Sequence, residues 1–178
     1  MAPPARPPIL LPSQFLYVAV DSGLLPALAA PRTRDELARD LAISSFYIAL
    51  LHTRDRFHQL ALELYGELAA ERPVVFVTSE AVLVETLTRL SKYGPFLRKA
   101  AAEFVAGLPE EPRVVVEDQT RTLFFAGLDL HRRRLDKNYS MTDCMSMVIC
   151  RERGVTDVLT ADHDFEQEGF AVLLKRQR

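Results

Sequence analysis

Two aspartates in the C-terminal part of the chain constrain its fold more than any other feature. Asp143 opens an apolar helical stretch that runs from Ser140 to Arg153, and Asp162 ends an apolar strand-like stretch that begins near Val155. In an α/β protein, residues beyond the carboxyl ends of parallel strands meet in one crevice. Two carboxylates at one edge of a sheet can hold a divalent metal ion. The pattern therefore predicts an α/β fold with an acidic site.

Apolar strand-like runs alternate with helical patterns along the rest of the chain. We expect strands at residues 15–20, 74–77, 114–116, 155–162 and 170–174. We expect helices from Thr33 and over residues 57–68, 80–90, 95–105, 120–134 and 140–153, the last of them stopped by Gly154. Such alternation is typical of an α/β sandwich around a parallel sheet.

The chain has 178 residues, which is enough for one domain with a core of its own. We expect a single domain over residues 13–178, preceded by a proline-rich tail over residues 1–12 that is extended or disordered. No apolar run approaches the ~20 residues of a membrane-spanning helix. Cys144 and Cys150 are the only cysteines, and we interpret them as reduced thiols of a cytoplasmic protein. Because the net charge is −2, any contact with RNA must come from local basic patches.

Four carboxylates are expected at the carboxyl edge of the sheet. Asp21 follows the first predicted strand, Glu85 lies on the helix after the second strand, and Asp143 and Asp162 flank the fourth strand. Carboxylates gathered in one crevice repel each other unless a cation lies between them. Mg²⁺ or Mn²⁺ suits such oxygen ligands, acidifies a bound water molecule and stabilises charge on a phosphate group. The set therefore predicts metal-dependent hydrolysis of phosphodiester bonds.

Three of the four carboxylates also have a simpler interpretation. Asp143 stands three residues after Ser140, which is the spacing of a helix capping box. Asp162 could be a turn residue after its strand, and Glu85 could be an ordinary solvated residue of a helix. We prefer the metal site only because the acids occur together in the order and spacing of a known family.

Three segments carry that resemblance: Thr78–Leu87 with Glu85, Thr142–Ser146 with Asp143, and Thr160–Phe165 with Asp162. From about Ser45 to Leu174 the chain resembles the PIN-domain ribonucleases, particularly the VapC-type toxins of prokaryotic toxin–antitoxin pairs. The resemblance implies a PIN-like three-layer α/β/α sandwich with a central, mainly parallel sheet. It implies a Mg²⁺- or Mn²⁺-dependent endoribonuclease with an RNA substrate, a cognate antitoxin as protein partner, and often a homodimer.

The first motif of the family is interrupted in this chain. The family has a strand, Asp, Thr or Ser, another Ser, and then an apolar helix. Ser45–Leu51 matches the start of the helix, but Ile43 stands where the Asp belongs, and an isoleucine side chain cannot bind a metal ion. The first predicted strand, by contrast, ends in Asp21-Ser22. Joining Ser22 to Ser45 restores the motif and makes residues 23–44 an insertion.

Two interpretations of the first motif remain. In the first, Asp21 is the first acid and the segment after it loops out of the domain. In the second, Ile43 occupies the position of the acid, and activity is weak or absent. We favour Asp21, because Ala42-Ile43 is too short an apolar run for a central strand, whereas residues 15–20 form a strong one. Asp40 is a weaker substitute for the first acid.

Hydroxyl side chains are expected to support the acids. Ser146 lies one helical turn from Asp143 on the same side, where it would hydrogen-bond a metal-bound water molecule. A bond from the Ser146 hydroxyl to its own helix is an equal alternative. Ser22 and Thr160 are similar candidates. Asp164, just beyond the last acid, is expected to cap a short helix that begins at the next residue.

Basic residues on predicted helices are candidates for an RNA path: Arg89, Lys92, Arg98, Lys99 and Arg132–Arg134. Basic residues on exposed helix faces are more often simply solvated. The leading hypothesis is an endoribonuclease with Asp21, Glu85, Asp143 and Asp162 as catalytic, metal-binding residues. The alternative, which Ile43 motivates, is a catalytically impaired PIN-like domain that binds RNA or a protein without cleavage.

Overall fold

The computed structural model describes residues 40–42, 44–70 and 75–175. Some predictions concern residues outside these ranges. They are the proline-rich tail over residues 1–12, the strand over residues 15–20, the helix from Thr33, and the roles of Asp21, Ser22 and Ile43. All of these stay predictions, as does the single domain over residues 13–178.

The described residues form a sheet whose strands alternate with helices. In chain order the elements, with η for 3-10 helices, are β1 (Asp40–Ala42), α2 (Ser44–Leu51), α3 (His58–Ala70), β2 (Phe76–Ser79), α4 (Glu80–Leu90), η4 (Ser91–Tyr93), α5 (Pro95–Gly107), η5 (Leu108–Glu110), β3 (Val114–Glu117), α6 (Arg121–Arg133), α7 (Met141–Arg153), β4 (Asp157–Leu159), α8 (His163–Gln167) and β5 (Ala171–Val172). The helices expected over residues 80–90, 95–105, 120–134 and 140–153 are confirmed as α4, α5, α6 and α7.

The strands are arranged in the order β3-β2-β1-β4-β5, and every pairing between neighbours is parallel. β1 is the central strand, in which Leu41 lies opposite Val77 of β2 and Val158 of β4. The predicted parallel sheet is therefore confirmed. Because parallel strands all point the same way, the residues that follow β1, β2 and β4 emerge at one edge.

The expectation that Ala42-Ile43 is too short an apolar run to provide the central strand is wrong. β1 fills this place with Asp40–Ala42, paired on both sides. A central strand exchanges backbone hydrogen bonds with two neighbours, so that pairing in the tertiary structure, rather than the length of the apolar run, decides whether it forms. The end of the predicted insertion over residues 23–44 thus contributes to the sheet, and its residues up to 39 lie outside the described ones.

Asp40 is not a substitute for the first acid. It begins β1 and lies opposite Phe76 and Asp157, which begin β2 and β4. Ligand sites of parallel α/β sheets lie at the opposite, carboxyl edge. The position of Asp40 at the amino edge therefore removes it from the candidate set.

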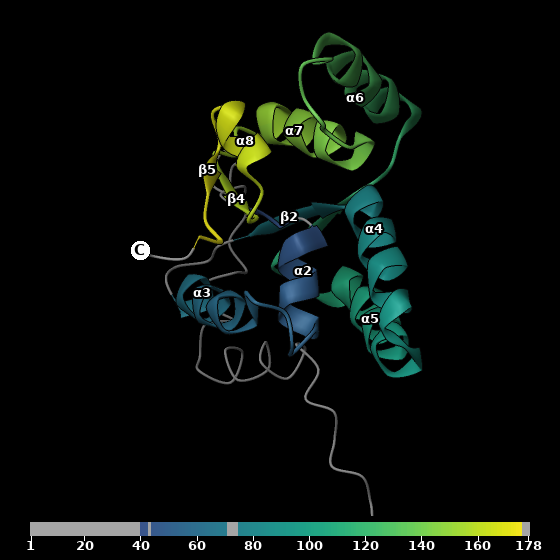
Figure 1. Cartoon of the computed structure of the whole chain (residues 1–178), viewed down its shortest axis with the longest axis vertical. Helices are drawn as coiled ribbons and strands as arrows, with labels where there is room; N and C mark the ends of the chain where they lie inside the picture. The colour runs from purple at the N-terminus through teal and green to yellow at the C-terminus, as the bar shows by residue number, and fades with distance from the viewer. Residues whose placement is uncertain (1–39, 43, 71–74, 176–178) are drawn as a thin grey trace, which may run out of the picture.

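Two groups of helices cover the two faces of the sheet. In Figure 1 strand β2 runs between α6 and α7 on one side and α2, α4 and α5 on the other. Helix α6 packs mainly on α7, while α2 contacts α3, α4 and α5. The three-layer α/β/α arrangement expected from the resemblance is therefore confirmed.

Helix α7 begins and ends as its sequence predicts. Ser140 is the N-cap residue and forms a capping box with Asp143. Gly154 is the C-cap residue, with a positive φ of 65° that a side chain would strain. These two local signals set the bounds of the helix that carries the third motif.

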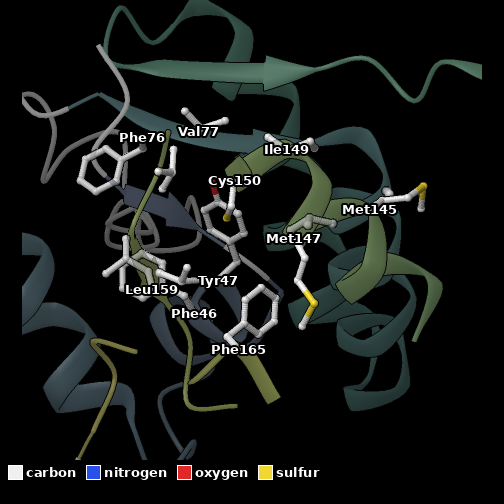
Figure 2. Close-up of a cluster of buried hydrophobic side chains, with 14 of the residues drawn as sticks. Phe46, Tyr47, Phe76, Val77, Met145, Met147, Ile149, Cys150, Leu159 and Phe165 are labelled. Carbon is white, nitrogen blue, oxygen red and sulfur yellow. The ribbon is translucent and has the colours of Figure 1, made fainter. Parts of the chain in front are cut away.

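The interior of α7 joins the layers into one core. Figure 2 shows its Met147 and Cys150 in the same buried cluster as Tyr47 of α2, Val77 of β2 and Leu159 of β4. The thiols of both cysteines are buried and free. Burial raises the pKa of Cys144 to about 11 and of Cys150 to about 12, so that both remain protonated and act as small apolar side chains.

Among the described residues, no helix combines the length and the hydrophobicity that crossing a bilayer requires.

We predict that Gly127→Ala destabilises the protein. Gly127 of α6 faces α7, and a Cβ atom there would lie 2.7 Å from Cγ and 3.2 Å from the backbone nitrogen of Met145. The two helices would have to move apart, at a cost of about 1–3 kcal/mol. This cost exceeds the gain of up to ~1 kcal/mol that alanine brings to a helix interior. Thermal unfolding of the variant and the wild type measures the difference.

Gly66→Ala in α3 is the matched control, because a Cβ atom at Gly66 would meet no atom within 4 Å. The control should unfold at a higher temperature than the wild type, through its gain in helix propensity alone. A Gly127→Ala protein as stable as the Gly66→Ala protein would contradict the close approach of α6 and α7.

Candidate active site

The carboxyl edge of the sheet gathers residues from three separate parts of the chain. Ser45 lies in the first turn of α2, directly after β1, and Glu85 lies on α4, which follows β2. Thr160 and Asp162 follow β4. The Ser45 and Thr160 hydroxyl oxygens are 3.2 Å apart and share a hydrogen bond. The first and fourth motifs are therefore in direct contact.

Asp143 has the structural role that its spacing from Ser140 predicts. Its Oδ2 accepts hydrogen bonds from the Ser140 backbone nitrogen, at 2.9 Å, and from the Ser140 hydroxyl, at 2.6 Å. The backbone N–H of Asp143 donates to the Ser140 hydroxyl at 3.1 Å. The capping box fixes the carboxylate at the positive end of the α7 dipole, where a negative charge is favourable. It therefore orients Asp143 without using all of its oxygen lone pairs.

Asp162 is the N-cap residue of α8. Its Oδ1 accepts a hydrogen bond from the Asp164 backbone nitrogen at 2.9 Å, and its own N–H donates to the Thr160 hydroxyl at 3.0 Å. The prediction that Asp164 caps a helix starting at Phe165 is therefore wrong, because the helix begins at His163 and the cap is Asp162. The fourth strand also ends earlier than predicted, at Leu159, so that a short turn separates it from Asp162.

Glu168, at the other end of α8, holds this helix in place. Its carboxylate forms ion pairs with Arg134 and Arg151, and it accepts a hydrogen bond from the Tyr139 hydroxyl at 3.1 Å. Only 3% of the Glu168 side chain is exposed. A buried carboxylate with two cationic partners needs this full set of bonds, and any change to one partner is costly. The cluster therefore fixes α8 and, through it, the position of Asp162.

Glu85 is neither fully solvated nor buried. Its side chain is 26% exposed, and its Oε1 lies 3.5 Å from Nε of Arg89, one turn along α4. Exposed ion pairs at this spacing contribute only a few tenths of a kcal/mol. Arg89 therefore tethers Glu85 weakly and leaves it free to bind a stronger cation.

The charges of the three acids interact. Burial raises the pKa of the Asp143 carboxyl above its ordinary value, and the negative charges of Asp162 and Glu85 raise it further. The hydrogen bonds from Ser140 act in the opposite direction. The structure thus brings Asp162 and Glu85 within electrostatic reach of Asp143, in an environment that disfavours an uncompensated negative charge.

Ser146 lies one turn after Asp143 in α7 and is completely buried. Its hydroxyl oxygen has no hydrogen-bond partner among the described residues. Buried hydroxyl groups without a partner are uncommon in folded proteins and often mark the place of a water molecule or an ion. The expected alternative, a bond from Ser146 to its own helix, is not formed.

The donor chemistry of this edge fits a hard divalent cation. Carboxylate and hydroxyl oxygens are the ligands that Mg²⁺ and Mn²⁺ prefer, and the unpaired Ser146 hydroxyl fits a neighbouring water molecule. Within residues 40–42, 44–70 and 75–175, no three acidic, histidine or cysteine side chains are already arranged closely enough to hold an ion. The predicted first acid, Asp21, lies outside these ranges.

Sequence reasoning did not assign a site role to Ser45. The hydroxyl of Ser45 reaches Thr160, and Ser45 also lines a cavity of about 760 Å³ that borders Asp162. The signal was present, because the first motif of the family ends in a serine at the start of this helix.

Comparison with known proteins identifies the relatives of the chain. Residues 44–170 match the family model of the PIN domain. The chain is 31% identical over 127 residues to a protein described as the 23S rRNA-specific endonuclease VapC20, in two strains of Mycobacterium tuberculosis, CDC 1551 / Oshkosh and ATCC 25618 / H37Rv. The match covers 71% of this chain and 92% of VapC20.

A solved structure is similar as well. The crystal structure of Mycobacterium tuberculosis VapC20, described as a sarcin-ricin loop cleaving toxin, has a TM-score of 0.65 and 30% sequence identity to the chain. The similarity covers 74% of this chain and 96% of that structure. The family match over residues 44–170 spans α2 to α8 and includes Glu85, Asp143 and Asp162.

We predict that Ser146→Ala does not destabilise the metal-free protein. Alanine removes a buried hydroxyl that has no partner, which should raise the free energy of unfolding by up to about 1 kcal/mol. Thr160→Val is the contrasting variant, because the Thr160 hydroxyl bonds both Ser45 and the Asp162 backbone, and its loss should cost about 1–3 kcal/mol. Urea unfolding in the presence of EDTA measures both. A clear destabilisation by Ser146→Ala would mean that its hydroxyl has a partner.

We also predict that Mn²⁺ raises the unfolding temperature of the wild type and that Asp143→Asn removes this rise. An ion at 100 times its Kd would add about 2.7 kcal/mol to the free energy of unfolding. Asparagine keeps a side-chain acceptor for Ser140, so that the helix cap is retained while the charge is lost. Asp129→Asn, on the exposed side of α6 in an ion pair with Arg133, is the control and should respond like the wild type. An equal response of Asp143→Asn would count against an ion at this edge.

Proposed function

The chain belongs to the PIN-domain family, and from this premise we propose that it is a metal-dependent endoribonuclease, the toxin of a toxin–antitoxin pair. The observation that carries the proposal is that Asp162 and Glu85 both lie within electrostatic reach of Asp143, at the carboxyl edge of a parallel sheet. The related VapC20 is described as an endonuclease specific for 23S rRNA, which supports RNA as the class of substrate.

The residues at this edge have distinct parts in the proposed reaction. Asp143, Asp162 and Glu85, with Asp21 as the fourth acid, would hold Mg²⁺ or Mn²⁺. Such an ion supplies a water-derived nucleophile at neutral pH and neutralises charge on the phosphate group. The cap of α7 orients Asp143, and the cap of α8 orients Asp162. Fixed carboxylates of this kind lose little conformational freedom when substrate binds.

The hydroxyl groups would support this arrangement. The Thr160 hydroxyl stabilises the turn that carries Asp162, because it accepts a hydrogen bond from the Asp162 backbone and shares one with the Ser45 hydroxyl. The buried Ser146 hydroxyl, without a partner among the described residues, would hold a water molecule beside Asp143. Ser22 would have a similar part beside Asp21.

A second candidate function is a catalytically impaired domain that binds RNA or a protein. One observation favours it: the central strand β1 ends at Ala42, and the next residue in the sequence is Ile43 rather than an acid. In this account Asp21 has no part in the site, and the remaining acids bind an ion weakly. The two accounts differ in whether the purified chain cleaves RNA.

The proposed function also implies protein partners and a cellular compartment. A toxin of this kind would be inhibited by a cognate antitoxin that covers the acidic edge, and it would often form a homodimer. Free cysteine thiols and an RNA substrate are consistent with the cytoplasm, where we expect the protein to act.

We predict that the purified chain cleaves ribosomal RNA in the presence of Mn²⁺. Asp143→Asn should lower the rate of cleavage by about 100-fold or more, because several kcal/mol of charge stabilisation in the transition state are lost. Cleavage is measured by gel electrophoresis of the RNA products. Asp129→Asn, the same substitution on a remote helix, should cleave at the rate of the wild type. Cleavage that is unchanged in Asp143→Asn would refute the proposed catalytic edge.

Asp21→Asn separates the two accounts of the first motif. If Asp21 is the first acid, this variant should lose activity to the same degree as Asp143→Asn while its unfolding temperature changes little. A fully active Asp21→Asn protein would remove Asp21 from the site. A wild type that is folded but cleaves no RNA would instead support the impaired domain.

A further inference from the structure

A cavity of about 760 Å³ adjoins the acidic edge and is large enough for one nucleotide. Asp162 and Ser45 form the side of the cavity that faces the acids. Arg89 at the end of α4 and Lys92 and Tyr93 of η4 also line the cavity. The loop between α2 and α3 adds the remaining wall. The cavity is therefore continuous with the proposed catalytic residues.

Cationic side chains line the cavity together with the acids Asp55 and Asp162. Lys92 is exposed and forms no ion pair with any described residue. Arg56, from the loop before α3, is exposed and lies with its guanidinium carbon 4.6 Å from the centroid of the Phe57 ring. Arg89 forms only a weak ion pair, with Glu85. Lys92 and Arg56 are thus available to a negatively charged ligand, although the whole chain has a net charge of −2.

An aromatic ring accompanies these cations. Tyr93 lines the cavity and is 56% exposed, although its ring is large and apolar. The imidazole ring of His52 packs against it, with the ring centroids 4.5 Å apart, so that the Tyr93 ring is supported rather than free to rotate. Exposed aromatic rings beside cationic groups are the combination that binds single-stranded nucleic acids, through stacking of bases and contacts to phosphates.

We infer that this cavity binds one unpaired nucleotide of the RNA substrate, next to the phosphodiester that lies at the acidic edge. The base stacks on Tyr93, and a flanking phosphate contacts Lys92 and Arg56. The inference rests on the proposed function for its substrate class, and it adds that the nucleotide must be unpaired. A base inside an A-form duplex is stacked on its neighbours and cannot reach the Tyr93 ring.

Sequence alone gives Lys92 and Lys99 an equal claim to contact RNA, and the structure separates them. Lys99 lies on α5, outside the cavity, and forms an ion pair with Glu103 at 3.6 Å. Lys99→Ala therefore removes the same charge as Lys92→Ala from a neighbouring helix, without touching the cavity. It is the matched control for the electrostatic part of the inference.

The test measures binding without cleavage. A short fluorescein-labelled single-stranded RNA is titrated with the full chain in EDTA, and fluorescence anisotropy gives the Kd. Tyr93→Ala should weaken binding by about 5- to 150-fold, the loss that one stacked base accounts for, while Tyr93→Phe should bind like the wild type. Lys92→Ala should weaken binding and reduce the slope of log Kd against log salt by about 0.7 for one lost phosphate contact, while Lys99→Ala should bind like the wild type.

The outcomes separate this inference from the proposed function. Binding with the expected loss in Tyr93→Ala and Lys92→Ala supports the cavity even if the wild type fails to cleave RNA in Mn²⁺. Equal binding by all variants, or an equal loss in Lys92→Ala and Lys99→Ala, overturns it. Equal affinity for the same RNA annealed to its complement overturns the requirement for an unpaired nucleotide. Circular dichroism of each variant establishes that the exposed substitutions leave the fold intact.

Discussion

The parallel pairing of β1 with both β2 and β4 is the constraint on which the rest of the structure depends. It places the residues that follow these strands at one edge, so that Ser45 and Thr160, which are 115 positions apart in the sequence, share a hydrogen bond. The same pairing sets the wall of the adjoining cavity, because α2 and α4 start from this edge. A shift in the register of the central strand would move one set of side chains away from the others.

The acidic edge works against the stability of the fold that carries it. Burial and the charges of two other acids raise the pKa of Asp143, and Ser146 leaves a buried hydroxyl without a partner among the described residues. Both features cost free energy in the metal-free protein. A bound cation would relieve the first and a water molecule the second. The capping box at Ser140 and the Glu168 cluster compensate locally by fixing the helices that bear Asp143 and Asp162.

Local signals in the sequence recovered much of the fold. The capping box at Ser140 and the glycine at position 154 set both ends of α7, and the periodicity over residues 80–90 gave the bounds of α4 without error. Sequence reasoning failed where the decision was not local. β1 is a short strand whose formation depends on its two neighbours. The two ion-pair partners of Glu168 and its one hydrogen-bond donor come from separate parts of the chain. The cap of α8 was assigned to Asp164 because the actual end of β4 was not visible in the apolar run.

The sequence by itself determined the alternation of strands and helices, the identity of the acids in the second, third and fourth motifs, and the family that they indicate. Only the tertiary structure decided that Asp40 lies at the amino edge of the sheet, and that the Ser146 hydroxyl has no partner in the described part of the chain. It also decided that Lys92 lines the cavity while Lys99 pairs with Glu103. The physical reason is the range of the interactions. Caps and helical periodicity act between residues a few positions apart, whereas strand pairing, burial and ion pairing depend on residues that meet only after the chain has folded.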